Sequence, residues 1–217
     1  MSDFAFHFEG GKTEWEDLRV VRFELTDAMS APYELRILLV GSPDGELDPF
    51  DLVGQRATLR IATGSTPAIR CVHGLVTEAE DKGLSQYGAL YELVLRPPFA
   101  RAACRTRSRI FLEKSLKQII EAVLGTGDRM QPGDPKSDGP DGLTDPFAAP
   151  EEKFAWRLLD TTRVEDPKAR PYVVQYQESD FAFVSRLLED EGIAYHFEHT
   201  DKAVIFVMSD HDDGRKK

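Results

Sequence analysis

Apolar and polar positions alternate along much of the first hundred residues. Every second residue is apolar in 33–39 and again in 57–61, a period of two that is typical of a β-strand with one buried face. Turn-forming pairs such as Gly10-Gly11 and Gly64-Ser65 separate further apolar segments, and we expect strands there at 4–8, 18–25, 69–77 and 89–95. Six short strands predict a β-barrel-like or rolled sheet over residues 1–98.

After Pro97-Pro98 the pattern changes to the period of a helix. Ser115 and Gln118 have the spacing of a capping box, and the apolar residues that follow Ser115 fall on one side of a helix over 115–124. A second apolar stripe begins after Ser179, a favourable N-cap residue. It stops at Gly192, which predicts a helix at about 180–191.

Strands flank the second predicted helix. The apolar run that starts at Tyr172 ends in a polar break before the helix, and residues 193–208 suggest a strand pair with a turn at 200–202. The fold class is therefore α+β. We expect a β-barrel-like N-terminal domain, residues 1–98, followed by an α+β region, residues 99–217, with two helices and a terminal β-hairpin.

The segment 125–150 interrupts this second region. It is rich in glycine, proline and aspartate, a composition that buries little surface, so we expect a mobile excursion that proteases cut first between Thr126 and Pro150. For residues 151–159 we expect a short amphipathic helix that packs Phe154 and Trp156.

Composition narrows the class of protein. The chain has 217 residues, 41% of them apolar, and a formal net charge of −11, which argues against nucleic acid or an anionic membrane as the main partner. It shows neither a signal peptide nor an apolar stretch of about 18 residues, so we expect a cytoplasmic protein with no stable membrane insertion. Cys71 and Cys104 lack the spacing of a zinc site, and we expect buried, reduced thiols.

Few residues have a pattern that suggests chemistry. His196 and His199, beside Glu198, would point to opposite faces of a strand, which disfavours a metal site. His211 lies among aspartates in a terminal tail, and we expect that tail to be solvated. We therefore expect no metal and no cofactor.

His73 is the best candidate for a catalytic base. Cys71 lies two positions before it, on the same face of the strand. A reactive Cys71 thiolate paired with His73 is one interpretation, but two side chains packed in the core or at its rim are favoured. Gly74 suggests a bulge or a close approach of two backbones. The chain has no Gly-x-Ser-x-Gly elbow and no glycine-rich phosphate loop, and an enzyme is therefore unlikely.

The acidic run 189–191 lies at the end of the second predicted helix, where negative charge opposes the helix dipole. It is either solvated or a charged contact with a partner subunit, with Arg105, Arg107 and Arg109 as candidate counter-charges.

Four segments together resemble one family. Residues 172–199 contain the sequence QYQESDFAFVSRLLEDEGIAY, and they follow LVGQRATL at 52–59, VHGLVT at 72–77, and RSRIF with Lys114-Ser115 at 107–115. In this order they resemble the hub region of VgrG, the spike of type VI secretion systems, which is similar in fold to the hub of contractile phage tails. The motif residues are Gly54, His73, Gly74, Arg107, Ser108, Arg109, Ile110, Phe111, Gln175, Tyr176, Glu178, Ser179, Asp180, Arg186, Leu187 and Gly192.

The resemblance covers most of residues 4–125 and 171–208 and implies a structural part of an injection machine. Hubs of this family associate as trimers, stack on a hexameric inner tube of Hcp-like rings, and help to deliver effectors. It implies a homotrimer as the full-length state, with baseplate proteins and toxin effectors as further partners. It also implies export from the cytoplasm with the apparatus, and structural rather than catalytic roles for the motif residues.

Two questions stay open at this point. The second barrel, the oligonucleotide-binding-like neck and the needle of that family are not in this sequence, which is either a truncated hub or a naturally short relative. A hub protein of a phage or phage-like particle is the alternative function, and a hydrolase or effector enzyme is the less favoured one.

Overall fold

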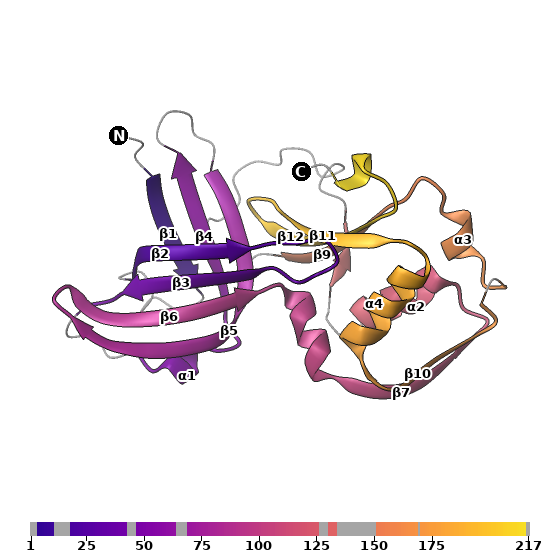
Figure 1. The fold of residues 1–217 in the computed structure, drawn as a ribbon, viewed down its shortest axis with the longest axis horizontal. Helices are drawn as coiled ribbons and strands as arrows, with labels where there is room; N and C mark the ends of the chain where they lie inside the picture. Colours follow the sequence, from indigo (N-terminus) through magenta and orange to yellow (C-terminus); the bar gives the residue numbers. More distant parts are fainter. Residues whose placement is uncertain are drawn as a thin grey trace.

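Six antiparallel strands form the N-terminal sheet (Figure 1). The computed structural model describes residues 4–10, 18–42, 47–63, 69–125, 130–133, 151–168 and 170–215. The strands are β1 (Phe4–Gly10), β2 (Arg19–Thr26), β3 (Glu34–Val40), β4 (Arg56–Thr63), β5 (Ile69–Ser85) and β6 (Gly88–Arg96), in the spatial order β1-β4-β5-β6-β3-β2. All six strands lie where the alternating pattern predicts them, and β5 continues eight residues further, to Ser85.

The sheet is curled. Its two edge strands, β1 and β2, contact each other but do not pair with each other. Alternate residues such as Leu35, Ile37 and Leu39 are completely buried on its concave side. Bulges at 20–22 and 76–78 increase the local twist. The predicted β-barrel-like architecture is confirmed, as a sheet that curls toward closure.

The second region contains two further sheets and the helices. The order in one sheet is β11-β12-β9-β8, and β7 and β10 form a separate two-stranded ribbon. The elements are α1 (Pro49–Leu52), the 3₁₀ helix η2 (Pro98–Cys104), β7 (Thr106–Leu112), α2 (Leu116–Val123), β8 (Gln131–Pro132), β9 (Glu151–Arg157), α3 (Thr162–Glu165), β10 (Tyr172–Ser179), α4 (Asp180–Asp190), β11 (Ala194–His199), β12 (Ala203–Ser209) and η4 (Asp213–Arg215). Both predicted helices and the terminal hairpin are present.

Helix α4 begins and ends as its sequence predicts. The Ser179 side chain accepts a hydrogen bond from the Ala182 N–H. At the other end Gly192 has a φ of +66°, and the N–H groups of Gly192 and Ile193 return to the carbonyls of Glu189 and Leu188. This pair of bonds requires a left-handed residue, which glycine adopts at little cost. Helix α2 likewise has its capping box between Ser115 and Gln118.

Residues 151–157 are a strand, and the expectation of a helix at 151–159 is wrong. β9 pairs in parallel with β12, with Phe154 opposite Phe206. The neighbours Phe154 and Ala155 point to opposite faces of the sheet and are both buried. A strand covered on both faces shows no alternation of apolar and polar residues, so its period cannot be distinguished from that of a helix.

The predicted excursion at 125–150 lies mainly outside the described residues, and so does the expected protease site. Within its described part, the buried Met130 donates its N–H to the carbonyl of Leu124, and Gly133 donates to Phe154. Residues 130–133 therefore belong to the fold, as the edge strand β8 and a core side chain.

Two smaller expectations are also corrected. Cys71 is buried, but Cys104 is exposed at the end of η2. The expected solvated tail is docked as far as η4, where the Gly214 carbonyl accepts a hydrogen bond from the buried Arg157. None of the helices in the described part of the chain is long and apolar enough to cross a membrane.

We predict that Leu187→Ala lowers the free energy of unfolding by roughly 2–5 kcal/mol, because Leu187 lies completely buried on α4 and its truncation leaves a cavity. Leu159→Ala removes the same atoms from an exposed position and should change it by less than about 0.5 kcal/mol. Urea denaturation followed by circular dichroism measures both, and equal midpoints for the two variants would contradict the burial of this face.

Candidate functional site

The carboxylate of Asp180 lies where β7, β10 and α4 meet. It is fully buried, and guanidinium groups surround it. Arg105 Nε is 3.0 Å from Oδ2, and Arg109 Nη2 is 2.5 Å from Oδ1. Arg107 Nε is 3.5 Å from Oδ2. A buried carboxylate needs such counter-charges, because taking an unpaired charge out of water costs several kcal/mol.

Gln175 links the arginines to the helix. Its Nε2 donates to Asp180 Oδ1 at 2.9 Å, and its Oε1 accepts from Arg109 Nε at 2.8 Å. A bulge in β10, where Gln177 has a φ of 49°, turns the chain between Gln175 and the helix. We call Asp180, Gln175, Arg105, Arg107 and Arg109 the Asp180 cluster.

The Asp180 cluster is positively charged. Desolvation by burial lowers the pKa of Arg109, Asp180 opposes this, and Arg107 and Arg105 add to the lowering. An arginine remains protonated at neutral pH in spite of such a shift. The Arg107 side chain is 46% exposed, so part of this positive charge reaches the surface.

Several motif residues support the same cluster. Arg186 donates to Glu178 Oε1 at 2.6 Å and lies over the ring of Phe183. Phe111 stacks on Phe183 with 5.7 Å between ring centroids. Ser108 Oγ accepts the N–H of Gln177 at 3.2 Å. The motifs at 107–111 and 175–187, far apart in the chain, therefore form one packed unit.

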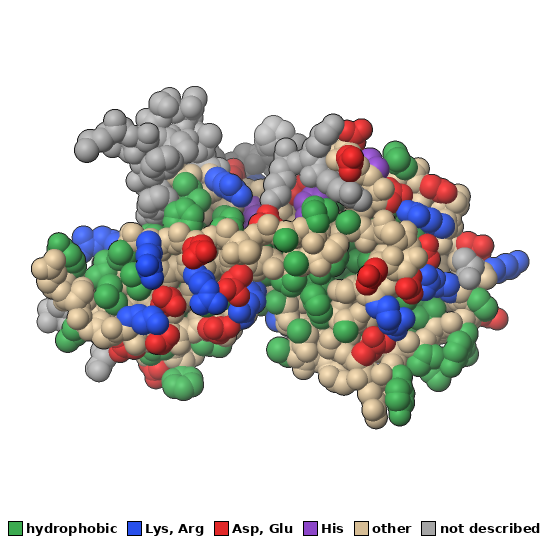
Figure 2. Space-filling model, viewed as in Figure 1, with side chains coloured by type: hydrophobic (Ala, Val, Ile, Leu, Met, Phe, Trp, Pro, Cys, Tyr) green, Lys and Arg blue, Asp and Glu red, His purple; other side chains and the backbone are tan. Residues whose placement is uncertain are grey.

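The ribbon of β7 and β10 has a second face that points away from α4. The strands pair with Leu112 opposite Tyr172 and Ile110 opposite Val174. Ile110, Leu112, Tyr172 and Tyr176 are 61–71% exposed. Figure 2 shows apolar side chains gathered over these two strands at the lower right. We call this the ribbon face; exposed apolar side chains in such a group are typical of a surface that binds another protein.

A buried glutamate joins the N-terminal sheet to the second region. Glu152 on β9 accepts hydrogen bonds from Arg56 Nη2 at 2.8 Å and from Arg101 Nη2 at 2.5 Å. Arg56 begins β4 and Arg101 lies on η2, so this carboxylate holds three elements together.

His73 forms a second connection between the two regions. Its Nδ1 is 2.8 Å from Thr58 Oγ1, its Nε2 is 2.7 Å from the Thr200 carbonyl, and its backbone N–H donates to His199 Nδ1. A carbonyl can only accept, so Nε2 donates to Thr200, and in the neutral ring Nδ1 then accepts from the Thr58 hydroxyl. Both ring nitrogens are occupied, and His73 acts as a buried structural bridge, with Tyr33 donating to its carbonyl.

Gly74 and Gly54 each require glycine at their position, for different steric reasons. A Cβ at Gly74 would lie 3.0 Å from Leu95 Cβ and 3.1 Å from the Arg96 carbonyl oxygen, which confirms a close approach of β5 to β6. Gly54 has a φ of +83° in the turn after α1 and donates its N–H to Val76. Both positions accept a side chain only with strain.

Glu198 is the centre of a third polar group. Arg157 donates to it through both terminal nitrogens, at 2.6 and 2.8 Å, and His196 Nε2 is 3.0 Å away. Burial alone would raise the pKa of Glu198, but the hydrogen bonds from His196 and Arg157 outweigh burial and lower it from 4.5 to about 2. This carboxylate is charged at all physiological pH values.

The histidines considered as metal ligands make other contacts and do not lie together. His196 faces Glu198, whereas His199 faces the ring of His73, with 5.8 Å between centroids. His211 Nδ1 is 3.0 Å from Asp210. The described part of the chain contains no group of three or more histidine, cysteine or acidic residues that could hold a metal ion.

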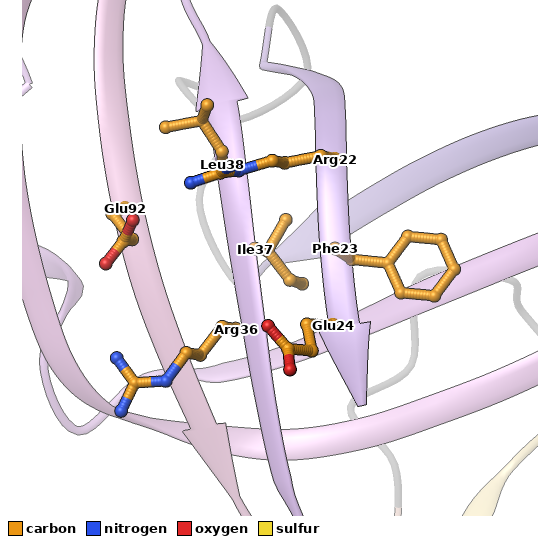
Figure 3. Close-up of a pocket in the computed structure, with 7 residues that line it drawn as sticks. All are labelled: Arg22, Phe23, Glu24, Arg36, Ile37, Leu38 and Glu92. Carbon is orange, nitrogen blue, oxygen red and sulfur yellow. The ribbon is translucent and has the colours of Figure 1, made fainter. Parts of the chain in front are cut away.

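A shallow pocket lies on the outer side of β2, β3 and β6 (Figure 3). Its volume is about 160 Å³, below the range of about 300–1,000 Å³ that is usual for ligand sites. Arg22, Arg36, Glu24 and Glu92 around it are charges of both signs, as on an ordinary solvated sheet face.

The acidic run at the end of α4 finds a partner within the chain. Arg170 Nη2 is 2.7 Å from Glu191 and its Nη1 is 3.4 Å from Asp190. The suggested counter-charges, Arg105, Arg107 and Arg109, gather instead at Asp180, at the opposite end of the helix.

Comparisons with known proteins agree with this geometry. The family model described as the phage tail baseplate hub (GPD) matches residues 26–217. The type VI secretion system spike protein VgrG4b of Pseudomonas aeruginosa is 33% identical over 194 residues, which is 89% of this chain and 20% of that protein. VgrG2a of the same organism is 28% identical over 209 residues, 95% of this chain and 21% of that protein. The chain thus spans about a fifth of the length of these relatives.

A solved structure has a similar fold. The E. coli c3393 protein is described as a component of the type VI secretion system that resembles the T4 tail proteins gp27 and gp5. It matches with a TM-score of 0.67 at 25% identity, over 92% of this chain and 50% of that one. The curled six-stranded sheet, followed by two smaller sheets with packed helices, therefore has the fold of the tail-hub class of proteins. The chain belongs to the phage tail baseplate hub (GPD) family, and the resemblance to the VgrG hub is confirmed.

Several residues that hold the fold together have no distinctive sequence pattern. Glu152 and Arg157 lie in the segment 151–159, whose pattern predicts a helix, and Thr58 and Thr200 are small polar residues within ordinary strand and turn patterns. A buried strand that contains charged residues, such as EEKFAWR, is the signal that could have indicated buried ion pairs.

We predict that Asp180→Asn destabilises the protein by about 3–5 kcal/mol, because it keeps the shape but leaves three guanidinium groups without their buried counter-charge. Asp190→Asn makes the same change in an exposed pair with Arg170 and should cost less than about 1 kcal/mol. Chemical denaturation of both variants checks this; a cost for Asp180→Asn no larger than for the control would refute the role of the cluster.

We predict that Glu198→Gln destabilises the protein at pH 7 by up to about 3 kcal/mol, and that the difference disappears in acid. The folded-state pKa is about 2, below the unfolded value of about 4.3, so the stabilisation is complete above pH 4.3 and is lost as the pH falls toward 2. Unfolding measured at several pH values from 7 to 2 tests this, and a pH-independent difference would contradict it.

Proposed function

We propose that this chain is the first hub region of a VgrG-type spike, a structural component of a contractile injection machine. The observation that carries the proposal is the match of residues 26–217 to the tail-hub family together with the similarity to a type VI secretion component over 92% of the chain. In this role it assembles as a homotrimer on a hexameric, Hcp-like tube and helps to deliver effectors.

The curled, incompletely closed sheet supports this role. Among the described residues, its edge strands β1 and β2 contact each other but are not paired, so each has one side with which a further strand could pair. A part of a ring of subunits needs such edges, because its neighbours complete the structure. We also propose that residues 1–98 and 99–217 are its two structural parts, which one continuous cluster of buried residues unites.

The motif residues have structural roles in this proposal. Most of those at 107–111 and 175–187 build the Asp180 cluster and its packing, whereas Ile110 and Tyr176 lie exposed on the ribbon face. The remaining motif residues permit turns, close approach or the junction between regions: Gly54, His73, Gly74 and Gly192. The curated relatives are mostly named spike proteins, which favours a structural role; one is named an actin cross-linking toxin, and this chain matches 18% of that protein's length.

Further partners and the location follow from the same role. Baseplate proteins and toxin effectors are the partners that a spike of this family meets, and the protein is made in the cytoplasm before export with the apparatus. A hub of a phage or phage-like particle is the second candidate, favoured by the family's description as a phage tail baseplate hub.

Binding to tube proteins tests the proposal. We expect this chain to sediment with assembled tubes of a type VI tube protein and not with tubes of a phage tail protein; the reverse preference would support the second candidate. Light scattering on a fusion of this chain to the second barrel and needle of a VgrG spike should give a trimer. A strictly monomeric fusion at micromolar concentration, with no binding to either tube, would reject both functions.

A further inference from the structure

The end of the β11–β12 hairpin closes an open edge of β5. In the part of the chain that the structure describes, β6 pairs with β5 only from Leu75 onward, so residues 69–74 are paired with β4 alone. At His73 two side chains occupy the other edge. The backbone N–H of His73 donates to His199 Nδ1 at 3.2 Å, and its carbonyl accepts from the Tyr33 hydroxyl. His73 is buried, so its amide depends on this acceptor.

The two histidines of this contact respond differently to a proton. His73 Nε2 donates to the Thr200 carbonyl, and its Nδ1 faces the Thr58 hydroxyl, which can accept as well as donate. A second proton on His73 therefore leaves both bonds intact. His199 Nδ1 faces an N–H group, and it accepts only while it carries no proton. A second proton on His199 turns this nitrogen into a donor and removes the acceptor of the His73 amide.

Charges of both signs lie in the elements packed against this contact. The Tyr33 ring contacts the His199 ring, with 5.1 Å between centroids, and the carboxylates of Asp27 and Glu152 act on Tyr33. The other charged residues are Glu9, opposite Thr58 in the register of β1 and β4, Arg60 on β4, and Asp201 and Lys202 in the hairpin turn. Acidic residues outnumber basic ones in this set, which favours a charged imidazole, whereas the His73 amide favours a neutral one.

We propose that His199 is a pH-sensitive latch, whose protonation in mildly acidic solution releases the end of the β11–β12 hairpin from β5. Figure 1 shows this hairpin between the second region and the N-terminal sheet, and both of its strands contact β5. Histidine in water gains its second proton near pH 6.5, at about which no other side chain normally changes its charge. The inference goes beyond the proposed function and does not depend on it.

Release of the latch is a local opening, because other connections between the two regions do not titrate in this range. Glu152 remains bound to Arg56 and Arg101, and the apolar core still continues from one region into the other. Glu198, on the same strand as His199, stays charged, since its pKa is about 2. We therefore expect the fold to survive while the edge of β5 at residues 69–74 becomes accessible to water.

Hydrogen exchange followed by mass spectrometry tests the latch in the full chain. We compare peptides that contain residues 70–74 at pH 7 and pH 5, as protection factors, which correct for the effect of pH on the exchange chemistry itself. We expect the protection of the His73 amide to fall at least about tenfold at pH 5, and that of α4 to stay unchanged. Equal protection of the His73 amide at both pH values would overturn the proposal.

Three variants identify the sensor. His199→Asn places an amide oxygen near the position of Nδ1 and does not titrate, so we expect high protection at both pH values. His199→Ala lacks the acceptor at every pH and should exchange at pH 7 as the parent chain does at pH 5. His211→Asn, a matched change at a histidine that contacts Asp210, should keep the response of the parent chain.

A pH response that persists in either His199 variant, or one that His211→Asn abolishes, would overturn the proposal. Far-ultraviolet circular dichroism at both pH values shows that each variant is folded. If His199→Asn does not fold, the comparison of His199→Ala with the parent chain still decides, because only a latch at His199 makes the variant at pH 7 equal to the parent at pH 5.

Discussion

A carboxylate without access to water, that of Asp180, can stay charged only among cations, and this requirement organises the second region. The chain supplies the cations from Arg105, at the end of η2, and from Arg107 and Arg109 on β7, and brings a second strand beside β7 through Gln175. The carboxylate also begins α4, where a negative charge suits the helix dipole. One buried anion therefore fixes the register of a ribbon and the position of a helix.

Buried polar groups also determine how the two regions are joined. The apolar core continues from one region into the other, but apolar contacts tolerate sliding, whereas hydrogen bonds do not. Glu152 with its two arginines, and His73 between Thr58 and Thr200, have partners on both sides. Such groups add little net stability after desolvation, so their main effect is to select one relative orientation.

Local sequence signals were enough to predict most of the fold. Period-two alternation located the N-terminal strands, and the caps at Ser115 and Ser179 located the helices, because these signals depend on neighbouring residues only. The strand at 151–157 could not be predicted locally, because it is defined by its pairing with residues 203–209, which are far away in the chain. The arginines of β7 were recognised as a motif, but their partner Asp180 could be identified only in three dimensions.

The pairing of β9 with β12 has a consequence for synthesis. Residues 203–209 form an inner strand of the four-stranded sheet, yet they leave the ribosome after every other strand of that sheet. Until they emerge, Phe154 and the apolar side chains of β11 lack the strand that covers them. A nascent chain therefore holds an incomplete sheet with exposed apolar residues for the time needed to translate about fifty residues, a few seconds at ordinary rates. The fold of this region is completed late, and it is during this interval that a chaperone is of most use.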